Sequence, residues 1–352
     1  MNINLDKIDF SRADPGKMRD HLLNFSNYCQ DAWDLASDFA LPSYFIKYRK
    51  IVFLGMGASG IVGEFLKDLL SSSSAIVECV HDYDLPAWVD KETLVIALCH
   101  SGNTEEVLYA FVSAYEKNAK LMAITTGGKL ESLCSKYRAP IIKYQIICEP
   151  KLAFSYLLII PYVILVKIGL LDHNKDEFEK NLLNVSALIK KISTDIHIAV
   201  NPAKDLASKI FSLPIHIISS GNLRAAGIRF SDSINENAKN LCSYYFLPEI
   251  NHTLVAGLEN PQEVIVKSIF IFFESKFSRP EIKRRINITA AVMNNNKVQY
   301  IRIDFSQASD KLSEILQSVI FSDYVGMYLG FLNQVDPTSA KIVESIKDEL
   351  SK

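Results

Sequence analysis

The first half of the chain alternates short apolar runs with segments of helical spacing. The run that starts at Lys50 ends in glycines (IVFLGMG), and apolar residues then recur at helical intervals over Ile61–Leu70. This pattern predicts a strand, a glycine-rich turn and a helix. A helix is also expected over Glu105–Lys117, between further apolar runs that predict strands: Ala75–Val80, Thr93–Cys99, Lys120–Thr125 and Pro140–Tyr144. Strands that alternate with helices indicate a parallel, doubly wound α/β sheet.

The same pattern restarts in the second half. PIHIISSG from Pro214 predicts a strand and a glycine turn, and Arg224–Asn240 predicts the helix that follows. Strands are expected near Leu241–Leu247, Val264–Phe273 and Val298–Phe305. The halves therefore resemble a divergent repeat. The expected organisation is an N-terminal helical strap (1–45), a first domain (46–174), a linker helix (175–200), and a second domain (201–352) that ends in a helical tail.

Length and composition agree with two globular domains. The 352 residues are 49% hydrophobic and 22% charged, with a net charge of -2, so neither disorder nor an electrostatic footprint for nucleic acid or an anionic membrane is expected. Tyr156–Leu171 is shorter than the ~20 residues that span a bilayer, and it contains Pro161 and Lys167, so a buried helix is expected there. Six scattered cysteines show no metal-site spacing, and MNINLDKIDF lacks the pattern of a secretory signal. A cytoplasmic protein without a bound metal is therefore expected.

Two loops carry the candidate chemistry. GMGASG (Gly55–Gly60) joins a strand to a helix, where backbone N–H groups and the helix dipole favour an anion. Because no acidic residue stands at the end of the second strand, the loop does not match the full dinucleotide-binding motif. CHSGNTEEV follows the next strand and places hydroxyls and an amide at a helix start, although Thr104 could serve only as an N-cap. With TTGGKL from Thr125, the loops are expected to converge on one crevice for a small phosphorylated ligand.

These motifs resemble the sugar isomerase (SIS) domain. The later segments, EPKLAFSYL at Glu149, NENAKN at Asn235 and LPEINHT at Leu247, resemble the bifunctional phosphoglucose/phosphomannose isomerase family from about residue 50 to the C-terminus. The resemblance implies two tandem flavodoxin-like SIS domains in a homodimer. It also implies aldose–ketose isomerisation of glucose 6-phosphate, and of mannose 6-phosphate, with fructose 6-phosphate through a cis-enediol, without a cofactor.

The resemblance assigns roles to single residues. Glu236 matches the family's base, His252 a ring-opening residue supplied by the partner subunit, and Lys347 a lysine that approaches the sugar; Lys151 stands where an arginine should face the reacting carbons. Without the resemblance, Glu236 and Lys347 would be ordinary helix-surface residues, and His252 a solvated histidine. The residues that match the phosphate-binding set are Gly57, Ala58, Ser59, Cys99, Ser101 and Thr104. Ala58 replaces a usual glycine, and Cys99 replaces a serine hydroxyl with a weaker thiol.

Two alternatives remain at this stage. The chain could be a non-catalytic SIS regulator that binds hexose phosphates, although its first 45 residues lack a basic helix-turn-helix. It could also be another sugar-phosphate isomerase, for which the combination of Glu236 and His252 would not be expected. Tolerance of both C2 epimers is assigned in the family to a threonine near the C-terminus, and Thr338 is the nearest candidate.

Overall fold

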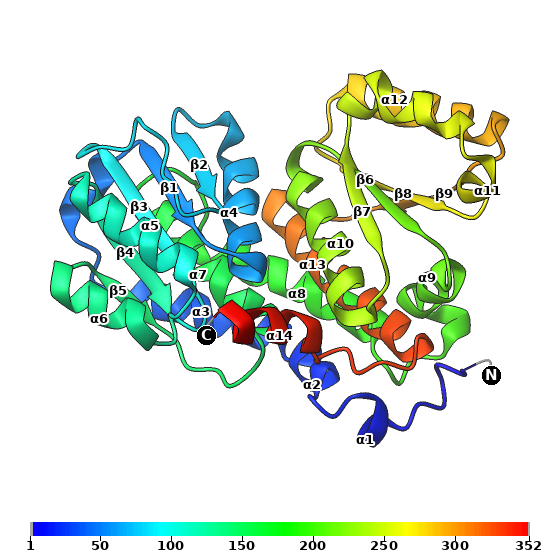
Figure 1. Cartoon of the computed structure of the whole chain (residues 1–352), viewed down its shortest axis with the longest axis horizontal. Coiled ribbons are helices and arrows are strands. Elements are labelled where there is room, and N and C mark those ends of the chain that lie inside the picture. The colour runs from blue at the N-terminus through cyan, green and yellow to red at the C-terminus, as the bar shows by residue number, and fades with distance from the viewer. Residues whose placement is uncertain (1–2, 351–352) are drawn as a thin grey trace. The chain divides into compact units, whose positions relative to one another are not determined.

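A computed structural model describes residues 3–350, apart from the side chains of Lys347, Asp348 and Leu350. The chain divides into two compact units (Figure 1). Unit 1 consists of the segment up to Leu23 together with Leu183 onward, and unit 2 is Asn24–Leu182. Helix α8 (Lys175–Ile192) runs across the boundary between them.

Unit 2 contains a five-stranded parallel sheet in the order β2-β1-β3-β4-β5. Its strands are β1 (Lys50–Leu54), β2 (Ile76–Val80), β3 (Thr93–Cys99), β4 (Lys120–Thr125) and β5 (Ile141–Lys143). Its helices are α3 (Phe25–Asp38), η1 (Ser43–Lys47), α4 (Gly57–Leu69), η2 (Leu70–Ser72), α5 (Glu105–Glu116), α6 (Gly128–Tyr137), η3 (Pro150–Ala153) and α7 (Phe154–Lys167). The strands and the α5 helix expected from the hydrophobic pattern are confirmed.

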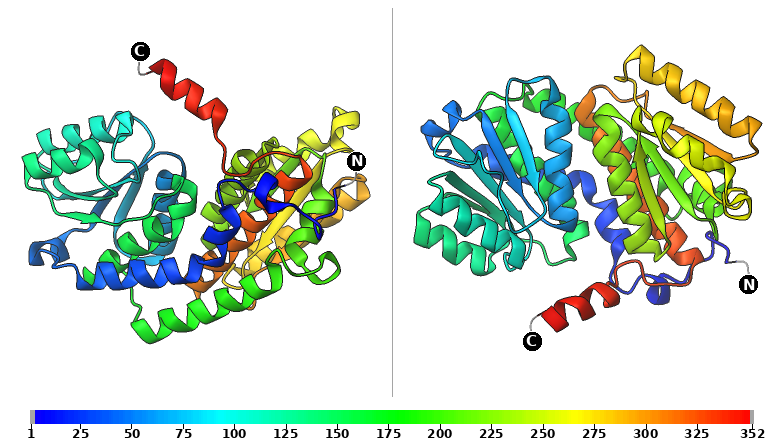
Figure 2. Two further views of the ribbon diagram at one scale, coloured as in Figure 1. Left: turned by 90° about the horizontal axis from the view of Figure 1, so that it is seen from below. Right: turned by 45° about the horizontal axis from the view of Figure 1, so that its top comes forward.

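Helices cover both faces of this sheet (Figure 2). On one face, alternate strand residues such as Val95 and Ala97 pack against the apolar side of α5 and α6. α4 and α7 contact the sheet as well, and α3 packs along α7. Because α7 is enclosed, its residues Phe154–Leu165 are all buried, and the buried helix expected in this region is confirmed.

Unit 1 contains a four-stranded parallel sheet in the order β7-β6-β8-β9. Its strands are β6 (Ile215–Ser219), β7 (Cys242–Phe246), β8 (Ile269–Glu274) and β9 (Gln299–Asp304). Its helices, besides α8, are α1 (Phe10–Ala13), α2 (Met18–Leu23), η4 (Ile198–Val200), α9 (Pro202–Ile210), η5 (Gly221–Leu223), α10 (Arg224–Ala238), η6 (Glu249–His252), η7 (Leu254–Glu259), α11 (Gln262–Ile265), α12 (Pro280–Asn295), α13 (Lys311–Leu332) and α14 (Lys341–Leu350).

One strand of unit 1 begins later than the sequence predicts. We expected a strand over Val264–Phe273, but Gln262–Ile265 forms the short helix α11 behind Pro261, and β8 begins only at Ile269. A proline before the first helical residue favours a helical turn, which competes with the β-branched residues that suggested a strand.

Helix α10 packs closely along α13 through a pair of glycines. A Cβ on Gly326 would lie 2.3 Å from Ser233 Oγ, and one on Gly330 would lie 2.6 Å from the carbonyl oxygen of Asn237. Because Ser233 and Asn237 are four residues apart, this contact fixes the rotation of α10 about its axis. It thereby also fixes the direction of the residues just before them, Asp232 and Glu236.

The amino-terminal segment is tied to the carboxyl-terminal part of unit 1. Lys204 Nζ donates to Asp6 Oδ1 at 2.9 Å, and the backbone N–H of Ile198 donates to the same oxygen at 3.0 Å. The rings of Phe10 and Phe331 lie edge to face at 6.0 Å. Residues near the two ends of the sequence therefore share one core.

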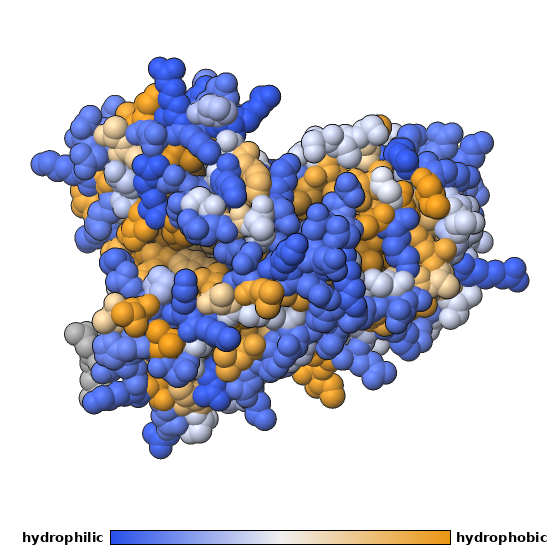
Figure 3. Space-filling model, turned by 180° about the vertical axis from the view of Figure 1, so that it is seen from behind, coloured by the Kyte–Doolittle hydropathy of each residue, from blue (hydrophilic) through white to orange (hydrophobic). Residues whose placement is uncertain are grey.

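Two helical stretches, Pro150–Lys167 and Lys311–Leu332, are long and apolar enough to cross a bilayer by length and composition. Of their apolar windows, 83% and 89% are buried inside the protein, as expected of core helices. On the face seen in Figure 3, apolar residues form separate patches among hydrophilic ones.

Candidate functional site

The predicted phosphate loops lie at the switch point of the unit 2 sheet. After β1 the chain continues to β2 on one side, whereas β3 pairs with the other side of β1. The strand order thus reverses between β1 and β3, and the segments 55–57 and 100–104 follow their carboxyl ends. Ligands of open α/β sheets bind in the crevice at such a point.

The first loop leaves backbone donors open at the start of α4. Gly57 has a φ of +52°, which favours glycine, and the preceding N-cap residue, Met56, makes no side-chain hydrogen bond to the helix. The N–H groups of Gly57 and Ala58 and the hydroxyl of Ser59 have no hydrogen-bond partner within residues 3–350. Together they form a polar helix start of the kind that binds anions.

A histidine is hydrogen-bonded to the first residue of this loop. His81 Nδ1 lies 2.9 Å from the carbonyl oxygen of Gly55, and its Nε2 lies 3.3 Å from Glu64 Oε1. The hydrogen bond with Glu64, and secondarily the one with Gly55, raises the pKa of His81 above its ordinary value. When protonated, His81 donates through both nitrogens and fixes the position of the glycine loop.

The second loop presents hydroxyls at the start of α5. Thr104 occupies the N-cap position as expected, but its side chain makes no capping hydrogen bond. Instead, Thr104 Oγ1 accepts from Cys99 Sγ at 3.3 Å, and Ser101 Oγ accepts from the N–H of Asn103 at 3.2 Å. Because no side chain caps α5, its first N–H groups stay available to a ligand. Cys99 is buried and positions Thr104 through its thiol.

The third loop supports the second. The N–H of Lys129, at the start of α6, donates to Asn103 Oδ1 at 3.0 Å, and the N–H of Leu130 donates to the carbonyl oxygen of Gly102 at 2.9 Å. Gly102 has a φ of +65°, and a Cβ there would lie 1.8 Å from the carbonyl oxygen of Gly127. The first N–H groups of α6 thus hydrogen-bond to the second loop and stabilise it.

Lys151 lies in η3, which packs against α4. It is only 5% exposed, which is unusual for a lysine. His100 anchors the segment before it: Nδ1 lies 2.9 Å from the hydroxyl of Tyr144, and Nε2 lies 3.1 Å from the carbonyl oxygen of Cys148. Burial lowers the pKa of His100. We did not select His100 from the sequence, although its place in the CHSGNT motif was a signal.

In unit 1, the NENAKN segment forms the end of α10 and fixes Glu236. Asn235 Nδ2 donates to the carbonyl oxygen of Cys242 at 2.9 Å, and its Oδ1 accepts from the N–H of the same residue at 3.0 Å, which ties the helix to β7. Lys239 Nζ donates to the carbonyl oxygens of Glu236 (2.8 Å) and Asp336 (2.7 Å). Glu236 itself is half-buried.

A group of charged residues precedes Glu236 on the same helix. The Arg229 guanidinium is buried and binds both carboxylate oxygens of Asp323, at 2.7 and 2.8 Å. Asp232 lies one turn before Glu236; burial, together with the charge of Glu236, raises the pKa of Asp232 to about 6 although Arg229 opposes this. We did not select Asp232 from the sequence; the i, i+4 spacing of the two carboxylates was the available signal.

The other residues assigned from the family lie elsewhere in unit 1. His252 is exposed at the end of η6, just beyond β7. Since Glu236 precedes β7, the two residues lie at opposite ends of this strand, whose five residues extend over roughly 16 Å. Thr338 is 7% exposed and donates to Asp336 Oδ1 at 2.6 Å. The side chain of Lys347 is outside the described residues.

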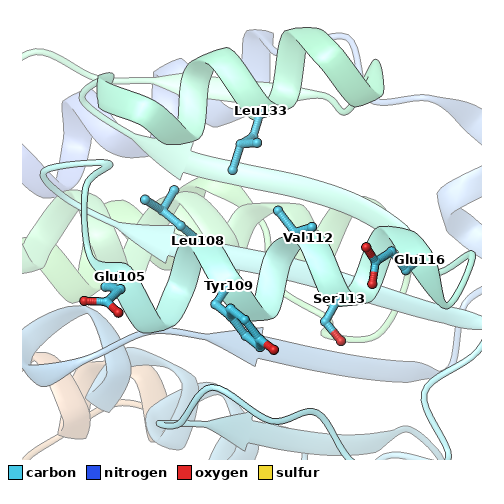
Figure 4. Close-up of a pocket in the computed structure, with 7 residues that line it drawn as sticks. All are labelled: Glu105, Leu108, Tyr109, Val112, Ser113, Glu116 and Leu133. Carbon is cyan, nitrogen blue, oxygen red and sulfur yellow. The ribbon is translucent and has the colours of Figure 1, made fainter.

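An open groove on unit 2 is lined by none of these residues. Its volume is about 420 Å³, and it is lined by Glu105, Leu108, Tyr109, Val112, Ser113, Glu116 and Leu133 (Figure 4). These residues come from α5 and α6 and include none of the residues predicted for the site. In the part of the chain that the structure describes, no group of three or more His, Cys, Asp or Glu side chains is arranged to hold a metal ion.

Comparison with known proteins gives matches over nearly the whole chain. Residues 44–139 match the SIS domain, and residues 199–350 match the bacterial phospho-glucose isomerase C-terminal SIS domain. The bifunctional phosphoglucose/phosphomannose isomerase of Caldicellulosiruptor bescii is 30% identical over 95% of this chain and 99% of its own length. The protein of the same name from Aquifex aeolicus is also 30% identical, over 92% of this chain and 96% of its own.

A solved structure supports the fold. A hypothetical protein from Thermus thermophilus superposes with a TM-score of 0.75 at 12% identity, covering 97% of this chain and 92% of its own. At this level of identity, the likeness establishes the tandem α/β architecture alone.

Proposed function

This chain belongs to the bifunctional phosphoglucose/phosphomannose isomerase family, and from that membership we propose that it interconverts glucose 6-phosphate and mannose 6-phosphate with fructose 6-phosphate. The observation that best supports this is the pair of helix starts at the unit 2 switch point, α4 and α5, neither of which is capped by its own side chains. A phosphate monoester supplies the acceptors that both lack. The SIS domains are proposed to span 46–174 and 201–352.

In this proposal the first two loops hold the phosphate. The N–H groups of Gly57 and Ala58 and the hydroxyl of Ser59 donate from α4, while Ser101 and Thr104 donate from the second loop. Cys99 acts as a positioning residue, because its thiol holds Thr104. Phosphate binding keeps the sugar in place while the proton moves between C1 and C2.

Glu236 is proposed as the base. It removes the proton from C1 or C2, and a cis-enediolate forms. As a proton moves between O1 and O2 through the cis-enediol, Glu236 returns its proton to the neighbouring carbon. Because the substrate both loses and regains the proton, and its oxidation is internal, the reaction needs no cofactor. Lys151 and Lys347 are proposed to stabilise the negative charge of the intermediate.

His252 is proposed to open the sugar ring from the partner subunit of a homodimer. The separation of Glu236 and His252 by the length of β7 supports this, since one hexose phosphate is shorter than roughly 16 Å. We place the enzyme in the cytoplasm, where hexose phosphates are metabolised, with no role for nucleic acid or a membrane.

Conversion of fructose 6-phosphate to each aldose phosphate tests the proposal. Glu236→Gln keeps the size of the side chain but removes the base, so kcat should fall by about 10²–10⁴-fold with little change in KM. Glu263→Gln, at an exposed glutamate of the same unit, is the control and should be unaffected. A wild type that binds these sugars without turning them over would indicate a regulator, and preference for another sugar phosphate would indicate a different isomerase.

Mixing two inactive variants tests the partner's contribution. Glu236→Gln and His252→Ala should each be inactive alone. After subunits exchange, a mixed dimer contains one intact site if His252 acts across the dimer, so activity should return. Continued inactivity after demonstrated exchange would place both residues in one chain's site.

A further inference from the structure

A fully buried carboxylate lies at the switch point of unit 1. Glu314, in the first turn of α13, is 0% exposed. Its Oε2 accepts from Asn222 Nδ2 at 2.9 Å and from Ser275 Oγ at 2.7 Å, and its Oε1 accepts from the N–H of Lys276 at 2.9 Å. Within residues 3–350, no Lys, Arg or His side chain forms an ion pair with it. An amide, a hydroxyl and a backbone N–H thus hold this anion, as they do in phosphate loops.

The donors come from the two loops that correspond to the candidate phosphate loops of unit 2. The strand order of unit 1 reverses between β6 and β8. Asn222 follows β6, and Ser275 and Lys276 follow β8, just as 55–57 follow β1 and 100–104 follow β3. Glu314 therefore bridges the two loops that a ligand would bridge in unit 2.

Corresponding serines show the same local geometry. Ser275 Oγ accepts from the N–H of Phe277 at 3.0 Å, and Ser101 Oγ accepts from the N–H of Asn103 at 3.2 Å. In each serine, the hydroxyl oxygen is thus already an acceptor, and a ligand would be held through the hydroxyl proton. Ser275 gives its proton to Glu314, whereas Ser101 is exposed. Glu314 therefore accepts from Ser275 in the way that a phosphate oxygen would accept from Ser101.

We propose that Glu314 is an internal ligand that fills a second anion site at the β6/β8 switch point, so that each chain holds only one phosphate monoester, in unit 2. Without this carboxylate, the unit 1 crevice would accept inorganic phosphate or a phosphate monoester through Asn222, Ser275 and Lys276. Burial raises the pKa of Glu314, whereas the hydrogen bonds from Ser275, Asn222 and the N–H of Lys276 act in the opposite direction by favouring the carboxylate. The unit 2 site is part of the proposed function, but the carboxylate's contacts do not depend on it.

The test removes the internal ligand and supplies inorganic phosphate. Thermal unfolding of the full chain is measured in phosphate and in chloride at equal ionic strength. Ser59→Ala/Ser101→Ala is used as the background, so that the unit 2 site contributes little. Adding Glu314→Ala should lower Tm in chloride and create a phosphate-dependent rise of about 2–4 °C. Absence of this rise overturns the proposal.

Leu312→Ala is the matched control. It damages the core in the same turn of α13, at a residue that is 2% exposed, and it should show no gain in phosphate. Glu314→Gln keeps the crevice filled and should likewise show no gain. A phosphate gain equal to that of Glu314→Ala in either control would overturn the proposal, because it would not depend on emptying the anion position.

Binding stoichiometry in the wild type keeps the proposal testable if Glu314→Ala does not fold. Equilibrium dialysis with fructose 6-phosphate should give one site per chain, which is lost in Ser59→Ala/Ser101→Ala. A second site that survives those substitutions and is blocked by Ser275→Ala overturns the internal-ligand proposal. If, instead, the single site survives them and Ser275→Ala has no effect, the assignment of phosphate to unit 2 fails while Glu314 remains the occupant of unit 1.

Discussion

Unit 2 and unit 1 build the same turn at the same place in their sheets. After the central strand, the chain passes through a glycine with a φ of +52° at Gly57 and +51° at Gly221, and a Cβ at either glycine would meet no atom within 4 Å. After the neighbouring strand, Ser101 and Ser275 make matching turns. The units differ in what the next helix contributes. In unit 2, the start of α6 donates the N–H of Lys129 to Asn103, whereas in unit 1, α13 inserts the carboxylate of Glu314.

This difference shows that a doubly wound fold supplies the geometry of an anion site without determining whether the site is open. One side chain on a neighbouring helix is enough to fill it. In unit 1, the residue assigned as base, Glu236, precedes the amino end of β7 and does not follow the carboxyl end of β6. In the proposed function, the two units therefore contribute from different ends of their strands.

The largest effect is expected from Gly102→Ala, which disrupts the contact between the second loop and α6 in unit 2. A Cβ would lie 1.8 Å from the carbonyl oxygen of Gly127, in addition to the strain at a φ of +65°. Unfolding free energy should fall by about 3 kcal/mol or more, and KM should rise at least about tenfold. Gly169→Ala is the control for strain alone: its φ is +75° but no atom lies within 4 Å, so about 1–2 kcal/mol and an unchanged KM are expected.

The corresponding serines should separate binding from stability. Ser275→Ala leaves a buried carboxylate short of a donor, so it should cost about 1–3 kcal/mol of stability without changing KM. Ser101→Ala affects an exposed hydroxyl, so it should raise KM about tenfold and leave stability within about 0.5 kcal/mol. Chemical denaturation and steady-state kinetics measure both. The same outcome for the two variants would contradict the contrast between the exposed Ser101 and Ser275, which is hydrogen-bonded to Glu314.

The smallest effect concerns Asp232, beside the proposed base. Because its pKa of about 6 in the folded protein is above the ordinary 3.8, the native state holds this proton longer than the unfolded state. Its contribution to stability is therefore lost as the pH rises from about 4 to about 6. Asp232→Asn should be more stable than wild type by about 1 kcal/mol at pH 7, and the difference should shrink towards pH 4. A difference that is independent of pH would contradict this account.

Much of the fold could be predicted because parallel strands are buried on both faces. Runs such as Thr93–Cys99 are fully buried and end at polar loops, so a local pattern was sufficient. Helix α13 was not identified because residues all around it are buried, which removes the helical period. The same reason hid the role of Glu314, since a single glutamate in an apolar run gives no sign of the distant donors in Asn222 and Ser275.

The residues of the candidate site also divide into those with a local sequence signal and those without one. Gly57, Ser101 and Thr104 could be selected because loops after strands have local signals. Glu236, His252 and Lys151 came only from the resemblance, because a lone charged residue in a helix or turn has no distinguishing pattern. His100 acts through Tyr144 and Cys148, which folding brings near, and the sequence alone does not show such partners. Asp232 was missed although its i, i+4 spacing to Glu236 is visible in the sequence.

The tie between Asp6 and Lys204 sets an order of events during synthesis. Residues 3–23 belong to the same unit as residues 183–350, while the whole of unit 2 is translated between them. At ~5–20 residues per second, the ribosome takes roughly 8–30 s to pass from one segment to the other. Unit 2 can therefore fold before the residues that contact the amino-terminal segment have been synthesised. A circular permutant in which the two segments of unit 1 are continuous in sequence would remove this delay.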